Sequence, residues 1–255
     1  MIELPSRQID RLLPFYDPGM PNRAMIYATL EGRTPGRAWV DDLDTPSTCV
    51  VVIHFHNLTF YPRRLEQAWL DRTLPRLREE EALVLSWTPA QRPGLSLPLR
   101  PEEVYDRFEF SDRRPTQAPA PLPPGAALRR IDRALLARCA WREMMVRAHG
   151  SEAGFLQEGF GLCLMREDEI LCEVYAVFLG ANCFEIGVFA PEAHRRQGYA
   201  TVACDHLARA CEAQGHDVHW SCEQDNLGSA ATARKLGFRR ETAHQWLVYP
   251  RNGAC

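Results

Sequence analysis

The segment FEIGVFAPEAHRRQGYA, from Phe184 to Ala200, constrains the fold of this chain more than any other stretch. It begins with a mostly apolar strand pattern, continues through a short loop, and enters a helical pattern that extends to Gln214. This order places unpaired backbone N–H groups and the positive end of a helix dipole at the edge of a sheet, where they favour a phosphate group. Gly198 lets the backbone approach such an anion closely, and Arg195 and Arg196 add positive charge.

A second motif follows one predicted strand later, over Val218–Cys222. The sequence NLGSAATARKLGF, from Asn226 to Phe238, predicts a helix with Asn226 as its N-cap and Gly237 at its end. Taken alone, the first motif also fits an ordinary amphipathic helix with basic residues in its entry loop. The two motifs together, R-x-x-G-x-A and N-x-x-S followed by K-L-G-F, resemble the acetyl-CoA core of GNAT acetyltransferases over about residues 126–250.

This resemblance implies a GNAT fold, an α/β fold of the α+β type with a central mixed, mostly antiparallel sheet in the C-terminal half. It also implies acetyl-CoA as acetyl donor, with the pantetheine arm beside the strand 184–189 and Asn226 near the thioester end. The residues expected to contact the cofactor are Val188, Phe189, Ala190, Arg195, Arg196, Gln197, Gly198, Tyr199, Ala200, Thr201 and Asn226.

Glu185 is the expected general base. Deprotonating a lysine-like amine at pH 7 costs roughly 4–5 kcal/mol, so a base or a water chain must accept the proton. Glu185 and Gly187 share one face of a strand that is otherwise apolar, and many GNAT enzymes carry a working glutamate at the matching place. The alternative is a structural glutamate that pairs with an arginine or caps a loop.

The general acid is less clear, because Ala233 occupies the position where the family usually has a tyrosine. Coenzyme A leaves as a thiolate, and a thiol titrates near about 8.5, so departure without a donor is feasible. Ser229, Tyr199 and Cys222 are the candidates to supply a proton, and we carry Ser229 forward beside Glu185 as the expected catalytic pair.

The proline-rich stretch PTQAPAPLPPG, residues 115–125, predicts a stiff connector between an N-terminal half, 1–114, and a GNAT domain, 126–255. The N-terminal half predicts helices over Arg7–Phe15, Asn22–Leu30 and Arg63–Glu79, the last kinked or broken at Pro75. Strands are expected at 37–40, 49–53, 58–61 and 83–87. We read this half as a smaller α/β unit, a degenerate GNAT-like fold that binds no cofactor.

The C-terminal half predicts helices near 132–136, 141–148, 151–156, 198–214 and 226–236, with strands at 161–165, 170–179, 184–189, 218–222 and 245–249. The whole chain resembles a subgroup that includes zwittermicin-resistance-type acetyltransferases. The phrases that carry this finer resemblance are Ala38–Asp42 before Thr45–Pro46, Gly159–Gly161 and Ala233–Phe238.

The composition of the chain argues against several classes of binding partner. The net charge of −3 argues against nucleic acid, and the chain has no apolar stretch of membrane-spanning length. Nine cysteines without a Cys-x-x-Cys pair favour free thiols in a reducing cytoplasm over a disulfide framework or a zinc site. We expect no metal: His54 and His56 alternate along a predicted strand, but no third ligand accompanies them.

The sequence therefore favours an N-acetyltransferase that acts on a small-molecule amine by direct attack on the thioester. The alternatives are transfer to a protein or peptide amine, and a non-catalytic acyl-CoA-binding regulatory protein, which the alanine at 233 motivates. The oligomeric state stays open.

Overall fold

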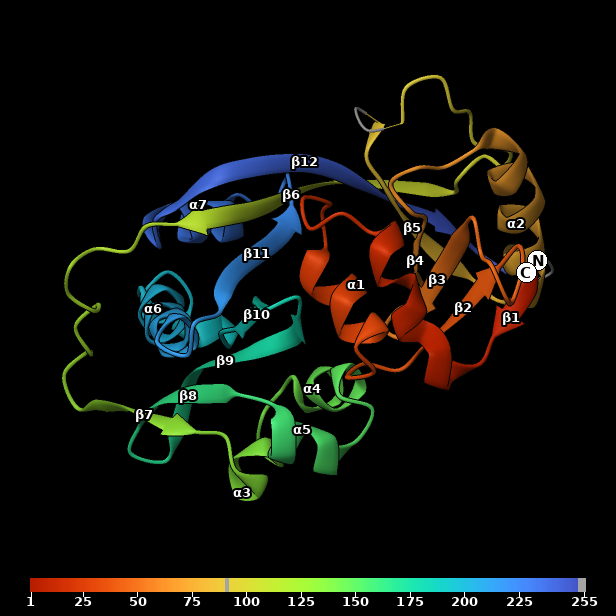
Figure 1. The fold of residues 1–255 in the computed structure, drawn as a ribbon. Helices are drawn as coiled ribbons and strands as arrows, with labels where there is room; N and C mark the ends of the chain where they lie inside the picture. Colours follow the sequence, from red (N-terminus) through yellow and green to blue (C-terminus); the bar gives the residue numbers. More distant parts are fainter. Residues whose placement is uncertain (90–91, 252–255) are drawn as a thin grey trace.

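One sheet of twelve strands runs through the whole chain (Figure 1). The computed structural model describes residues 1–89 and 92–251, so the last four residues of the predicted domain 126–255 lie outside the described residues. The strand order is β1-β2-β3-β4-β5-β12-β6-β11-β10-β9-β8-β7. The strands are β1 Ile2–Leu4, β2 Gly36–Val40, β3 Cys49–Ile53, β4 Leu58–Phe60, β5 Leu83–Trp87, β6 Glu103–Arg113, β7 Ala126–Arg130, β8 Gly161–Arg166, β9 Glu169–Gly180, β10 Cys183–Phe189, β11 Asp217–Glu223 and β12 Phe238–Tyr249.

Each half contributes six strands, and the strand order of the second half along the sheet is the reverse of the first, so that β12 and β6 meet at the centre of the sheet. In the N-terminal half, β4 and β5 pair in parallel and are joined by a helix; in the C-terminal half, β10 and β11 do the same. The last strand of each half is exchanged with the other half. Strand β12, from the C-terminal half, pairs with β5 of the N-terminal half, and β6, from the N-terminal half, pairs with β11 of the C-terminal half. The expected mixed, mostly antiparallel sheet and two-half architecture are thus present, and the halves share one sheet.

Helices cover both faces of the sheet. They are α1 Arg23–Leu30, α2 Gln67–Glu80, α3 Arg133–Leu136, α4 Arg142–Ala148, α5 Glu152–Glu158, α6 Tyr199–Glu212 and α7 Leu227–Lys235, with 3₁₀ turns η1 Ser6–Phe15 and η3 Glu192–His194.

Each helix buries its apolar side chains in one of three cores. On the C-terminal half, α6 and α7 share a core with β9, β10 and β11, whereas α1 and α4 pack on the opposite face. Helix α2 covers the N-terminal half, where Trp69 and Leu74 pack against strand residues such as Leu85.

Helix α1 crosses from the N-terminal half onto the C-terminal half of the sheet (Figure 1). The contact is close at Gly180, where a Cβ atom would stand 2.1 Å from the backbone nitrogen of Ala28. The absence of a side chain at position 180 therefore lets α1 lie directly on the end of β9.

Several expectations need correction. Strands β1, β6 and β7 were not predicted, and β12 begins seven residues before the predicted strand 245–249. The segment expected as an α-helix from Arg7 is a 3₁₀ helix. Pro75 does not break α2, which continues to Glu80 because buried Leu74 and Leu77 hold both sides of the proline in the core.

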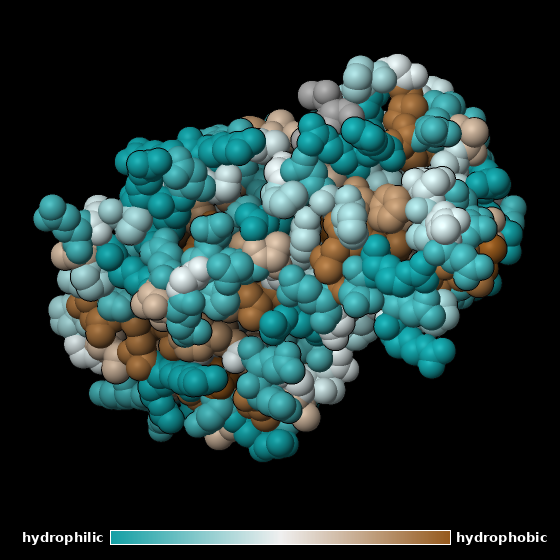
Figure 2. Space-filling model, viewed as in Figure 1, coloured by the Kyte–Doolittle hydropathy of each residue, from teal (hydrophilic) through white to brown (hydrophobic). Residues whose placement is uncertain are grey.

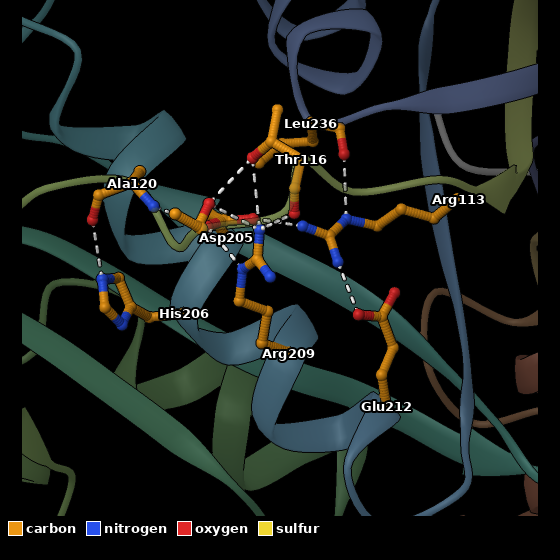
Figure 3. Close-up of polar contacts among 9 residues, drawn as sticks. Arg113, Thr116, Ala120, Asp205, His206, Arg209, Glu212 and Leu236 are labelled. Carbon is orange, nitrogen blue, oxygen red and sulfur yellow. Dashed lines mark hydrogen bonds and ion pairs between the residues drawn. The ribbon is translucent and has the colours of Figure 1, made fainter.

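The connector 115–125 is attached to the C-terminal half through α6 (Figure 3). Asp205 is buried and accepts hydrogen bonds from the guanidinium of Arg113, from Nε of Arg209 and from the backbone amide of Ala120. Arg209 also donates to the carbonyl oxygen of Thr116. Burial by itself raises the pKa of Asp205, but the hydrogen bonds and the charge of Arg113 outweigh it and lower the pKa below its ordinary value.

Polar side chains cover most of the face seen in Figure 1, and apolar ones show through as separate patches (Figure 2). Within residues 1–89 and 92–251, no helix is long and apolar enough to cross a membrane.

We predict that Asp205→Ala lowers the free energy of unfolding by roughly 1–3 kcal/mol, because buried Arg113 loses one of its two carboxylate partners and keeps only Glu212. Urea denaturation followed by circular dichroism measures the change. Glu80→Ala is the control, since its ion pairs with Arg37 and Arg76 lie near the surface and each contributes less than about 1 kcal/mol. Equal losses in the two variants would contradict the structural role of Asp205.

Candidate active site

The site begins where β10 and β11 separate. The two strands pair in parallel over only three positions, the last being Glu185 with His219. Directly after Glu185, the register of β10 against β9 shifts, as in a β-bulge, and Ile186–Phe189 continues to pair with β9 alone. Strand β11 turns away to pair with β6. The backbone of β10 beyond Glu185 therefore presents a free edge, to which an extended chain can hydrogen-bond.

A groove of about 750 Å³ follows this free edge to the start of α6. Gly198 stands at the N-cap in the left-handed region, with φ of 83°, and has no side chain to cap the helix. The amide of Val202 donates to the carbonyl of Gly198, so the amides of the preceding helical turn have no helical acceptor. These N–H groups border the groove beside Arg195 and Arg196, which makes this end suited to an anion.

The structure brings nearly all the predicted cofactor residues to this groove. Gln197 differs, because its side-chain amide donates to the carbonyl oxygen of Ala193 and holds the loop together. Arg195 likewise donates from Nε to the carbonyl of Ala190 while lining the groove. The predicted residues that line the groove are Val188, Phe189, Ala190, Arg195, Arg196, Gly198, Tyr199, Ala200, Thr201, Asn226 and Ser229.

At its inner end the groove meets a second cavity of about 290 Å³. Five residues line both spaces and mark the junction: Trp141, Val188, Trp220, Asn226 and Ser229. Asn226 is the N-cap of α7, where its Oδ1 accepts from the amide of Ser229 at 3.0 Å. A group that crosses from the groove into the cavity must pass these side chains.

Glu185 lines the second cavity and is 8% exposed. It has no hydrogen-bond partner within the part of the chain that the structure describes. Burial, reinforced by the negative charge of Glu109 and opposed by Arg107, raises the pKa of Glu185 to about 8. An unpaired buried carboxyl with this pKa can accept a proton near neutral pH.

The surroundings of Glu185 come mainly from β6 and β11. Glu109 is engaged, since it accepts from Nδ1 of His219 at 2.9 Å and from the backbone amide of Asn22. Arg107 donates to Oγ of Ser221 at 3.1 Å. His244 lies opposite Arg107 on β12, and burial lowers its pKa to about 4, so it adds no positive charge.

The candidates for a proton donor differ in position. Ser229 lies at the junction, where its Oγ accepts from Nε1 of Trp220 at 3.0 Å and its hydroxyl also lies in hydrogen-bond contact with Cys222. Tyr199 lines the groove away from the junction, and its hydroxyl accepts from Arg166. Cys222 lines the cavity, and burial raises its pKa. Ala233 is fully buried in the core and contacts neither space.

Sequence reasoning missed several lining residues. Trp141 stands at the junction with its ring 5.5 Å from that of Phe189, and Glu173 fixes its backbone by accepting from its amide at 3.2 Å. Arg107 belongs to the unpredicted strand β6, and Met25 comes from α1. The position of Trp141 at the start of a predicted helix was the one sequence signal for this residue, and it is weak without the fold.

The histidines considered for a metal pair lie elsewhere. His54 and His56 follow the end of β3 in an exposed turn, not on a strand, because the chain reverses directly after Ile53. Over residues 1–89 and 92–251, no group of three or more histidine, cysteine or acidic side chains is placed to hold a metal ion.

We predict that the Glu185→Gln variant becomes increasingly more stable than the wild type as pH rises. The folded state binds the proton of Glu185 more tightly than the unfolded state, so stability falls by at most about 1.4 kcal/mol per pH unit between the ordinary pKa of glutamate and about 8. The variant lacks this loss, which chemical denaturation between pH 5 and 9 would detect.

The exposed Glu143→Gln variant serves as the control for that comparison. If wild type and Glu185→Gln showed parallel stability curves across this range, Glu185 would titrate in the folded protein as an ordinary glutamate.

Known proteins share this architecture. In sequence, 130 residues are 29% identical to the uncharacterized N-acetyltransferase YdfB of Bacillus subtilis strain 168, a match spanning about half of each chain. A GCN5-related N-acetyltransferase-like protein from Streptococcus suis 89/1591 superposes with a TM-score of 0.65 at 20% identity, covering 94% of this chain and 98% of that one. A tandem GNAT protein from the clavulanic acid biosynthesis pathway superposes with a TM-score of 0.61 at 13% identity, covering 100% and 99%.

Because the sequence identities are low, the two structural superpositions show similarity of the fold alone. The family model described as GNAT acetyltransferase matches residues 19–248, which is most of the sequence. It spans both halves and includes the groove, the junction and Glu185. The chain therefore belongs to the GNAT acetyltransferase family.

Proposed function

We propose that this protein transfers the acetyl group of acetyl-CoA to the amine of a small molecule, by direct attack of the amine on the thioester. The observation that carries the proposal is the junction. A groove with a free strand edge and an anion-binding helix end meets a cavity that holds one unpaired buried carboxyl, Glu185.

The residues present fit acetyl-CoA. The free edge of β10 at Val188–Ala190 suits the amide-bearing pantetheine arm, and the amides at the start of α6 suit the pyrophosphate. Lys235 borders the same groove and adds a third cation to Arg195 and Arg196. When bound, acetyl-CoA supplies an activated acyl group on a thiol leaving group.

The transfer forms an N–C bond and breaks a C–S bond. Glu185 accepts the proton that the attacking ammonium must lose, either directly or through a water molecule. Ser229 stands at the junction, where its hydroxyl donates to the departing thiolate. Holding the amine and the thioester together at the junction supplies much of the remaining rate acceleration.

The N-terminal half supports a small acceptor over a protein one. Met25 of α1 and Phe55 of the β3–β4 turn line the cavity, whose volume of about 290 Å³ is near the lower end of the range for small-molecule pockets. The resemblance to zwittermicin-resistance-type acetyltransferases belongs to the same proposal. So do the cytoplasmic location, the boundary at 115–125 and a cofactor-free N-terminal half.

The alternative is a protein that binds acyl-CoA without turnover, which the buried Ala233 favours. Release of free thiol separates the two functions, because a binding protein never produces it with any amine.

We predict that the double variant Arg196→Glu, Gly198→Asp weakens acetyl-CoA binding at least tenfold from a micromolar wild-type Kd, because it places two negative charges at the anion site. Isothermal titration calorimetry measures the affinities. Arg129→Glu reverses the charge of an exposed arginine on β7 and should bind like the wild type. A wild type that does not bind acetyl-CoA would remove the basis of the proposal.

We predict that kcat/KM for thiol release rises with pH to an inflection near 8, and that Glu185→Gln lowers it by about 10²–10⁴-fold and removes that inflection. The amine titrates identically with both enzymes, so the difference between the two profiles isolates Glu185. A variant within threefold of the wild type at every pH would assign the proton to another acceptor.

A further inference from the structure

We infer that the acceptor is an apolar monoamine: one cationic nitrogen on a compact hydrophobic body about the size of a single ring. This inference rests on the proposed function and specifies its substrate class. It follows from the walls, the charges and the size of the cavity that holds Glu185.

The walls away from Glu185 are apolar and come from four elements: α1, the β3–β4 turn, α4 and β9. Phe55 and Phe178 pack edge to face with ring centroids 5.1 Å apart. The side chains that form this wall are Met25, Phe55, Met144, Tyr175, Val177 and Phe178. Aromatic and methionine side chains gain most from covering an apolar, preferably flat, group.

Of the described charged residues that line the cavity, one acidic group has no partner and could pair with a cation on the acceptor. Arg107 is largely engaged by the protein itself: it donates to Ser221, lies 3.6 Å from the carboxylate of Glu223, and stacks 3.7 Å above the ring of Trp246. Its Nε has no hydrogen-bond partner among the described residues, but this atom is buried and shielded from solvent. A carboxylate on the acceptor would compete with Glu223 for this arginine and, once Glu185 is ionised, would be repelled by it.

A second ammonium group finds no partner either. Glu223 is paired with Arg107 and is 46% exposed, so water already solvates its carboxylate. Among the described acidic residues that line the cavity, Glu185 is therefore the one that is both buried and unpaired, and once ionised it matches one positive charge. This pattern disfavours amino acids and polyamines and favours monoamines.

The size sets the upper limit of the acceptor. A volume of about 290 Å³ lies at the lower end of the range for small-molecule pockets, so one ring and a short linker fill it. The linker must let the nitrogen reach Glu185 while the ring contacts Met144 and Phe178.

The test compares amines of matched size with the full chain and acetyl-CoA, following thiol release. Phenethylamine is the probe, phenylalanine adds a carboxylate to it, and putrescine replaces the ring with a second ammonium. We expect kcat/KM for phenethylamine to exceed that for the other two at least 100-fold. A preference for phenylalanine or putrescine would overturn the inference while leaving the proposed function intact.

A binding measurement keeps the two proposals separate. Phenethylamine titrated into the complex with free coenzyme A, which cannot react, should quench the fluorescence of Trp141, Trp220 and Trp246, all of which line the cavity. Saturable quenching without thiol release would support the acceptor class and contradict catalysis. Absence of saturable quenching would overturn the inference.

A variant tests the wall directly. Met144→Trp fills the cavity and should raise KM for phenethylamine at least tenfold, with little change for methylamine, which needs no ring space. Arg147→Trp makes the same replacement on the exposed side of α4 and serves as the control. Unchanged acetyl-CoA affinity verifies that both variants fold, and equal KM values in the two variants would place the acceptor elsewhere.

Discussion

The pairing of β6 with β12 is the contact on which the rest of the structure depends. The two strands are antiparallel from Phe238–Arg113 to Val248–Glu103, and each completes the sheet of the opposite half. Without β6, strand β11 would be an open edge, and the floor beside Glu185 would lose Arg107 and Glu109. The exchange therefore makes the two halves one sheet and makes the N-terminal half part of the candidate active site.

The separation of β10 from β11 follows from the same arrangement. Strand β11 leaves β10 after Glu185 and stays paired with β6 through Glu223, and the bulge in β10 coincides with the point of separation. The result is a free strand edge on one side and a buried carboxyl on the other. Burying Glu185 without a partner costs stability, and such a cost is typical of groups kept for chemistry.

Prediction from sequence was strongest where the signal is local. The loop before α6, its glycine at 198, and the Asn226 cap of α7 all lie as expected, because capping and turn geometry depend on neighbours in sequence. Strand β6 was not predicted because EVYDRFEFSDR carries charged residues on both faces of the strand and therefore lacks a clear alternation of apolar and polar residues. In the structure Arg107 and Glu109 are buried on one of these faces, and they are paired by residues of β11.

The sequence alone therefore determined the family resemblance, the strand–loop–helix that faces the anion and the candidate base at Glu185, since each depends on short motifs of neighbouring residues. The tertiary structure alone decided which side chains surround that base. Met25, Phe55, Arg107, Trp141 and Trp246 lie far apart in sequence and meet at one cavity. No local pattern specifies that meeting, because it depends on the exchange of β6 and β12 and on α1 crossing onto the other half.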